Sequence, residues 1–222
     1  MAKHGLITSS IGKKLIVGTA GLFLMMFLLV HLSINLLLLR NDGGEWFNAA
    51  SHFMGSNIIV KIFEVVLFGV FFIHIIYTLL LTFKNWASRP VKYFMTNKSQ
   101  TSFFSKYMFH TGVIIFVFLV FHFWHFFFIK LGFVSPPQGI DSENFYAMAS
   151  ILFNNPVYSI VYIIFFVFLG FHLNHSLQSA FQTLGFNHNL YTPFIKSVSM
   201  FCAVFISVGF SVIPVFYLIT DK

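Results

Sequence analysis

Uncharged stretches long enough to cross a membrane dominate this chain, and one of them constrains the fold most strongly. Residues Tyr107–Ile129 run for 23 positions without an Asp, Glu, Lys or Arg. A helix needs about 20 apolar residues to span the hydrocarbon core of a bilayer. The stretch nonetheless carries His122, and a polar ring at that depth costs free energy unless it has a partner. His31, His74 and His172 lie inside other apolar stretches in the same way.

Five long apolar stretches predict an all-α integral membrane protein. They are residues 15–39, 58–83, 107–129, 157–181 and 197–218. Helices are expected because an open strand cannot satisfy its backbone in lipid. With 58% hydrophobic and 9% charged residues, a water-soluble domain is excluded. We expect a single transmembrane domain over residues 1–222, a retained first span and no cleaved signal peptide, and a kink or late break at Pro214 in the fifth span.

The charged residues predict how the chain is oriented. Loops on one side carry nine bases and no acid: Lys3, Lys13, Lys14, Lys84, Arg89, Lys92, Lys98, Lys106 and Lys196. The other side carries four bases, Arg40, Lys61, Lys130 and Lys222, with all six acids. Basic loops stay cytoplasmic, so the N-terminus is expected inside and the C-terminus outside. This distribution also explains the net charge of +7, and we expect no nucleic-acid partner.

The four internal histidines fall into two pairs of equal depth. His31 follows the preceding charged residue by 17 positions and precedes the next by 9, and for His122 these intervals are 16 and 8. His74 and His172 lie 17 and 16 positions after the polar starts of their spans and 10 before the ends. Since alternate helices run in opposite directions, His31 and His122 lie in the outer half and His74 and His172 in the inner half.

In an up-down bundle of the first four helices, each pair points across the core from diagonal helices. Two imidazoles facing each other in an apolar, aromatic-rich interior are typical of the axial ligands of a b-type haem. The sequence therefore predicts two haems, with layers on the order of 10 Å apart from six or seven residues of helical rise. Bis-histidine iron has no open position, which favours electron relay. The single Cys202 excludes a Cys-ligated cluster and the attachment motif of c-type haem.

Two further histidines leave an alternative open. His125 and His175 each follow a predicted ligand by three residues, so each is a possible substitute ligand or a residue beside the haem. His4, His52, His110 and His188 are expected near the membrane interfaces. Several glycines, including Gly21, Gly112 and Gly170, could admit a macrocycle close to the backbone, but glycine is common in membrane helices.

The motifs around these histidines resemble those of a known family. They are FLLVHLSIN at His31, EWFNAASHFM in the first outer loop, FFIHIIY at His74, TGVIIFVFLVFHFW up to His122 and FHLNHSLQSAFQTLG from His172. The chain resembles, over nearly its whole length, the five-helix di-haem cytochrome b membrane anchor of succinate dehydrogenase or fumarate reductase. In that family the axial ligands fall on the same four histidines, which favours His122 over His125 and His172 over His175.

The resemblance implies a place in the respiratory chain and the tricarboxylic acid cycle, in a bacterial cytoplasmic membrane. A flavoprotein subunit would handle the dicarboxylate, an iron–sulfur subunit would carry electrons, and this chain, which has no dicarboxylate site, would exchange them with a quinone, usually menaquinone. The pair His74 and His172 would lie nearer the iron–sulfur subunit. Some relatives have a glutamate two residues before the fourth ligand, where this chain has Gly170, so proton transfer by that route is not expected here.

Three rival functions use the same residues differently. The HFWH and HLNH motifs are similar to the histidine boxes of membrane di-iron oxygenases, but they are expected in opposite halves of the membrane. A transporter or proton channel would need a polar path, and these helices are mainly Phe, Ile, Leu and Val. The nearest rival is a di-haem cytochrome of another quinone-linked dehydrogenase, which haem spacing alone does not distinguish.

Overall fold

The structure is a computed structural model that describes residues 9–88 and 107–220, and within these ranges it contains helices and no strand. Five helices are long and apolar enough to cross a membrane: Ser10–Leu39, Ile58–Ala87, Met108–Lys130, Pro156–Thr183 and Tyr191–Thr220. The prediction of an all-helical chain with five apolar helices is therefore confirmed. Lys3, His4, Lys222 and most of the basic loop after Lys84 lie outside the described residues.

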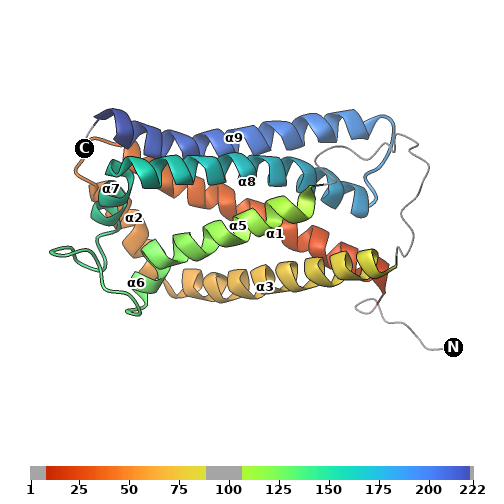
Figure 1. Ribbon diagram of the computed structural model, residues 1–222, viewed down its shortest axis with the longest axis horizontal. Helices are drawn as coiled ribbons and strands as arrows, with labels where there is room; N and C mark the ends of the chain where they lie inside the picture. The colour runs from red at the N-terminus through yellow and green to blue at the C-terminus, as the bar shows by residue number, and fades with distance from the viewer. Residues whose placement is uncertain (1–8, 89–106, 221–222) are drawn as a thin grey trace.

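The helices have the following bounds. The first span is α1 (Ser10–Asn35) with the 3₁₀ turn η1 (Leu36–Leu39), the second is α3 (Ile58–Ala87), and the third is α5 (Met108–His122), the π-helical turn η2 (Phe123–Phe127) and α6 (Phe128–Lys130). The fourth and fifth are α8 (Pro156–Thr183) and α9 (Tyr191–Thr220). Two short helices, α2 (Glu45–Ser56) and α7 (Phe145–Asn154), lie at one end of the molecule (Figure 1).

Side-chain caps define where several helices begin. The Asn57 side chain accepts hydrogen bonds from the backbone N–H groups of Ile59 and Val60, and the Asn155 side chain accepts one from Val157. Pro156 occupies the first turn of α8, where its missing N–H costs nothing. Asn is a favoured N-cap because it satisfies donors that have no partner within the helix. Pro214 lies buried inside α9, which continues to Thr220, so the predicted late break is absent.

The first four long helices surround a common interior, with α1 and α5 diagonally opposite. Helix α1 packs beside α3 and α8, and α5 packs beside α8. The fourth side is closed by aromatic contacts between α3 and the third span, such as Phe68 with Phe127 at 5.0 Å and Trp86 with Phe109 at 5.0 Å between ring centroids. Figure 1 shows these antiparallel helices with α9 on the outside, against α8. The predicted up-down order therefore holds for the described helices.

Helix α9 packs on α8 through small residues. A Cβ built on Gly170 of α8 would lie 3.0 Å from Ser207 Cβ, and the Ser207 hydroxyl donates to the Phe166 carbonyl at 2.8 Å. Ile206 and Tyr217 of α9 are among the most buried side chains of the molecule. This contact between α8 and α9 supplies much of the buried core, which leaves the interior among α1, α3, α5 and α8 for the histidines.

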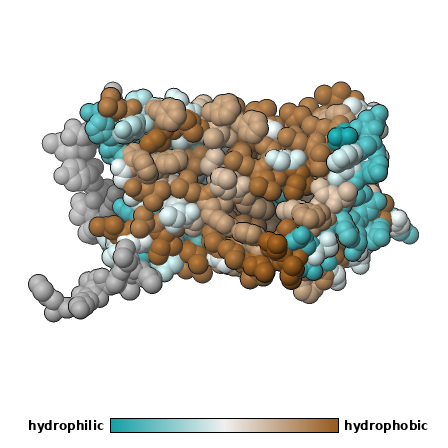
Figure 2. All heavy atoms as spheres, turned by 180° about the vertical axis from the view of Figure 1, so that it is seen from behind, coloured by the Kyte–Doolittle hydropathy of each residue, from teal (hydrophilic) through white to brown (hydrophobic). Residues whose placement is uncertain are grey.

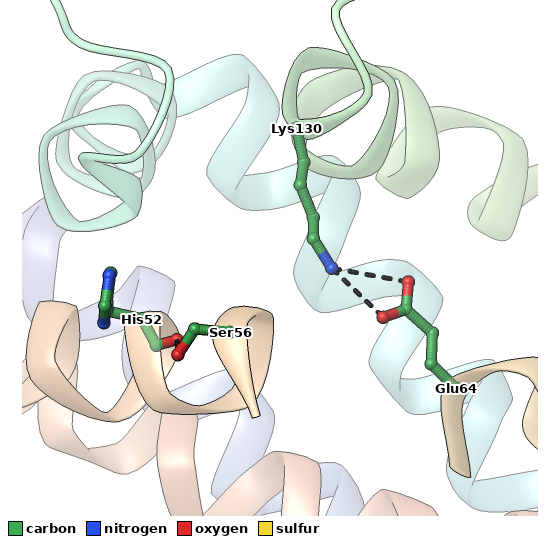
Figure 3. A network of polar contacts seen from close by, with 4 residues as sticks. All are labelled: His52, Ser56, Glu64 and Lys130. Carbon is green, nitrogen blue, oxygen red and sulfur yellow. Dashed lines mark hydrogen bonds and ion pairs between the residues drawn. The ribbon is translucent and has the colours of Figure 1, made fainter. Parts of the chain in front are cut away.

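The surface and the two ends match a protein that crosses a bilayer. Figure 2 shows hydrophobic residues over the middle of the visible face and hydrophilic ones gathered toward the ends. At one end, which we call the Lys84 end, the Lys84 ammonium donates to the Ser10 hydroxyl at 3.0 Å. At the opposite end, which we call the α2 end, Lys130 of α6 forms an ion pair with Glu64 of α3 at 3.2 Å. His52, also at this end, lies exposed on α2, apart from the ion pair (Figure 3).

Candidate functional site

His31 and His122 face each other in the interior. His31 lies near the C-terminal end of α1 and His122 ends α5, and their ring centroids are 5.8 Å apart with planes at 85°. Phe27 stacks on His31 at 5.3 Å, and Phe118 and Phe126 flank His122 at 5.7 and 5.3 Å. The structure thus brings together this predicted pair, within a shell of aromatic rings.

The distance between these two rings suits a single metal ion between them. With a metal–nitrogen bond of about 2.0–2.1 Å on each side and about 1.1 Å from each nitrogen to its ring centre, the centroids of two opposite axial imidazoles lie roughly 6.3 Å apart. The observed 5.8 Å is within about half an ångström of that value.

His74 and His172 form a second layer, toward the Lys84 end. His74 lies on α3 and His172 on α8, and each ring lies beside a glycine of α1 or α5. The Thr111 hydroxyl of α5 lies 3.3 Å from His172 Nδ1 and fixes the orientation of that ring. The second predicted pair therefore lies on the other two diagonal helices, in one layer.

Two glycines mark this second layer on the other two helices. A Cβ built on Gly21 of α1 would lie 3.6 Å from His74 Cε1, and one built on Gly112 of α5 would lie 3.7 Å from His172 Cε1. Gly21 precedes His31 by ten residues, and Gly112 precedes His122 by ten residues. Ten residues correspond to about 15 Å of helical rise. Each of these helices therefore carries a ligand candidate in one layer and a glycine beside a ligand candidate in the other.

This helical rise is longer than the separation on the order of 10 Å that the residue counts predict for the two haem layers, and the separation itself stays a prediction. That expectation measured depth from flanking charged and polar residues, and long charged side chains reach different distances toward the interface. The glycines give a reference inside the bundle, because a Cβ built on either one would lie within 3.7 Å of a ring of the second layer.

Buried ring nitrogens in both layers lack a hydrogen bond. His74 Nδ1 and His122 Nδ1 are buried with no partner of standard geometry among the described residues, although the Val17 carbonyl faces the His74 ring. An unpaired buried polar atom costs about 1–3 kcal/mol. Neutral imidazole is a common metal ligand, and a bond from one ring nitrogen sets what the other can do. The residues present therefore fit a metal-containing group held between each pair.

His125 does not join the interior. Its Nδ1 lies 2.9 Å from the Tyr162 hydroxyl, and its ring meets Tyr158 edge-on at 5.3 Å. The π-helical turn accounts for this placement, because at about 4.4 residues per turn three residues rotate by roughly 245° instead of the 300° of an α-helix. The ring is thus turned away from His31 and toward α8. The alternative pairing of His31 with His125 has no support in this geometry.

The described residues contain no cluster of three or more His, Cys, Asp or Glu side chains that could hold a metal ion directly. Each layer instead offers two histidines, the number that a bis-ligated haem requires from the protein. His175 is half-buried beside His172, whereas His110 and His188 are exposed near helix ends, as expected for residues near the interfaces.

Comparisons of the chain with protein-family models, with curated proteins and with solved structures find no match.

Proposed function

We propose that this chain is the cytochrome b membrane anchor of a succinate:quinone oxidoreductase, with two bis-histidine b haems. The observation that supports the proposal is the contact between the imidazoles of His31 and His122, together with a second pair of histidines at another depth on the other two diagonal helices. His31 and His122 would hold one haem, and His74 and His172 the other. A haem bound in each layer would supply a one-electron carrier within the membrane.

Side chains around the two layers would position the haems and keep water away from them. Thr111 orients the His172 ring, and the phenylalanines around His31 and His122 surround the layer at the α2 end with apolar contacts. Gly21 and Gly112 allow two backbones close to the layer at the Lys84 end. Solvent exclusion and hydrogen bonds near the ligands are the means by which a protein tunes a haem potential.

The proposed complex would couple two half-reactions on different subunits. Oxidation of succinate to fumarate releases two electrons and two protons, and reduction of a quinone to a quinol consumes the same numbers. The dicarboxylate chemistry would belong to a flavoprotein subunit, with an iron–sulfur subunit between it and the layer at the Lys84 end. The basic loops of that end would face the cytoplasm of a bacterium, and the quinone, proposed to be menaquinone, would exchange from the bilayer.

The rival oxygenase reading has less support. A di-iron site needs several histidines and carboxylates around one centre. His175 lies in the second half of α8, whereas His125 belongs to η2 and lies beside the first turns of α8. His125 contacts Tyr158, and from Tyr158 to His175 is 17 residues, or about 25 Å of helical rise.

Purification of the complex through this chain tests the proposal. A pyridine haemochrome assay and a reduced-minus-oxidised spectrum are expected to give two b haems per chain, together with a co-purifying flavoprotein and iron–sulfur protein. Two haems with a different dehydrogenase would assign the chain to another quinone-linked complex. Bound non-haem iron without haem would overturn the proposal in favour of the oxygenase.

A further inference from the structure

A cavity at the α2 end is not used by the histidine layers. It has a volume of about 340 Å³ and lies where the end of the third span meets α7, the start of α8 and the loop before α7. Its wall includes the following side chains: Trp124, His125, Met148, Ile151, Asn155 and Tyr158. Small-molecule sites typically measure about 300–1,000 Å³ and combine apolar walls with a few placed polar groups.

The polar groups in this wall have defined hydrogen-bonding capacity left for a ligand. His125 Nδ1 is engaged by the Tyr162 hydroxyl at 2.9 Å, so Nε2 is the ring nitrogen that can bond to a ligand. The Asn155 carbonyl oxygen accepts from the Val157 N–H, which leaves its NH₂ group as a donor. Either tautomer of His125 could bind a ligand oxygen, since Nε2 donates to a carbonyl in one tautomer and accepts from a hydroxyl in the other.

The remaining wall suits a flat apolar ring that arrives from the membrane. Trp124 and Tyr158 offer aromatic faces, and both are exposed, as is Ile151. Lipid would surround these exposed apolar side chains in a bilayer, so the cavity has an approach from the hydrocarbon phase. A planar ring with an oxygen at each end matches this combination of apolar walls and hydrogen-bonding groups.

The cavity also lies beside the layer of His31 and His122. His125 follows His122 by three residues, or about 4.5 Å of helical rise. The π-helical turn that directs His125 to Tyr162 therefore places one histidine of the third span toward the interior and the next toward the cavity. Such π-turns are frequent at functional sites.

We propose that this cavity is the quinone site of the chain, with His125 hydrogen-bonded to one quinone oxygen and the ring between Trp124 and Tyr158. The identification of the ligand as a quinone rests on the proposed function. It adds a location and a set of contacting residues that the histidine layers do not specify.

A matched pair of substitutions on the purified complex tests the site. Ile151→Trp fills the cavity, whereas Ile160→Trp changes an equally exposed isoleucine that is not part of its wall. The probe is 2,3-dimethyl-1,4-naphthoquinol, and the readout is the rate at which it reduces the haems. We expect Ile151→Trp to slow this rate at least tenfold and Ile160→Trp to change it less than twofold, with equal haem content and equal reduction by dithionite. Equal rates in the two variants would overturn the site.

Photolabelling with an azido-naphthoquinone gives a second readout that does not depend on haem. Label is expected on the peptides that contain Trp124 and Tyr158, and its yield is expected to fall at least fivefold in His125→Phe. Label confined to another region, such as the peptide of Glu64, would contradict the assignment. If the wild-type protein holds no haem but is labelled at the cavity, the proposed function fails while the ring-binding site stands.

Discussion

Three aromatic side chains enclose the ring of His122, one of the four candidate ligands. Phe118 stacks on it, Phe126 tilts against it and His31 meets it edge-on. A ring enclosed in this way has no access to water that could replace the opposite histidine when that histidine is substituted. Substitution of a candidate ligand should therefore affect its own layer first and leave the other layer largely intact.

The pairing itself makes the most direct residue-level prediction. His74→Ala is expected to remove the haem of the layer at the Lys84 end and to leave most of the other, whereas His31→Ala is expected to do the reverse. Each variant should retain about half of the wild-type haem, because a haem with one axial histidine is held weakly. Pyridine haemochrome quantification and potentiometric titration measure the two losses separately.

His110→Ala provides the control for this pair, since His110 is exposed at the start of α5. It should keep both haems and both potentials. Equal loss of the two haems in His31→Ala and His74→Ala would argue against separate layers.

Gly21 allows a test of the close approach in the layer of His74. Its Cβ position lies 3.6 Å from His74 Cε1, an ordinary contact, so Gly21→Ala should be tolerated. Gly21→Leu extends into the ring and is expected to displace His74, with loss of haem from that layer or a shifted potential. Overpacking of this kind typically costs about 1–3 kcal/mol.

The matched control is Gly69→Leu on α3, where a built Cβ meets no atom within 4 Å. Haem content and melting temperature in detergent compare the two leucine variants. If Gly69→Leu were as damaging as Gly21→Leu, the effect would come from helix insertion or folding and not from the ring contact.

At the scale of elements, the five spans could be predicted because their signal is long and uniform. A bilayer permits helices almost alone, so apolar length was sufficient to find them. The depth pairing of His31 with His122 likewise follows from counting residues along straight helices. The structure brings these two rings to 5.8 Å, and it places α1 diagonally from α5 as expected.

Other features of the structure were not predicted correctly from the sequence. The π-helical turn depends on the packing of Phe123–Phe127 against neighbouring helices, so the direction of His125 could not be derived from a three-residue spacing. A kink or late break was expected at Pro214; no break occurs, because packing around this buried residue lets α9 continue to Thr220. The ten-residue interval from Gly21 to His31, repeated from Gly112 to His122, was present in the sequence and could have been used.

The contact between α8 and α9 predicts how Gly170 responds to change. Some proteins of the resembled family have a glutamate at the matching position, but here a Cβ would already lie 3.0 Å from Ser207 Cβ. Gly170→Glu is expected to lower the melting temperature and the yield of folded protein sharply, because a carboxylate would be forced between packed helices. Gly170→Ala should cost about 1–3 kcal/mol by overpacking alone.

A double variant separates crowding from other causes. Gly170→Ala combined with Ser207→Gly removes the facing Cβ and should recover part of the stability lost in Gly170→Ala, a coupling expected of residues in contact. Strict additivity of the two melting-temperature changes would contradict the close contact between α8 and α9.

At the scale of the whole molecule, the two ends carry different residues. This difference bears on where the proposed quinone and the proposed soluble subunits would bind. The ion pair of Lys130 with Glu64, the short helices α2 and α7, and the cavity beside His125 all belong to the α2 end. Among the described residues, the Lys84 end holds basic side chains and no Asp or Glu. A complex with soluble subunits at the Lys84 end would thus exchange electrons with quinone near the opposite face.

This arrangement requires the Lys84 end to be cytoplasmic, which cysteine labelling can test. Ser88 and Ser142 are both exposed and lie at opposite ends of the bundle. In a Cys202→Ala background, Ser142→Cys should react with a membrane-impermeant maleimide in intact cells, because acid-containing loops are expected outside. Ser88→Cys should react only after the membrane is opened. The reverse pattern would place the basic loops outside and remove the basis for soluble partners at the Lys84 end, even if both haems were present.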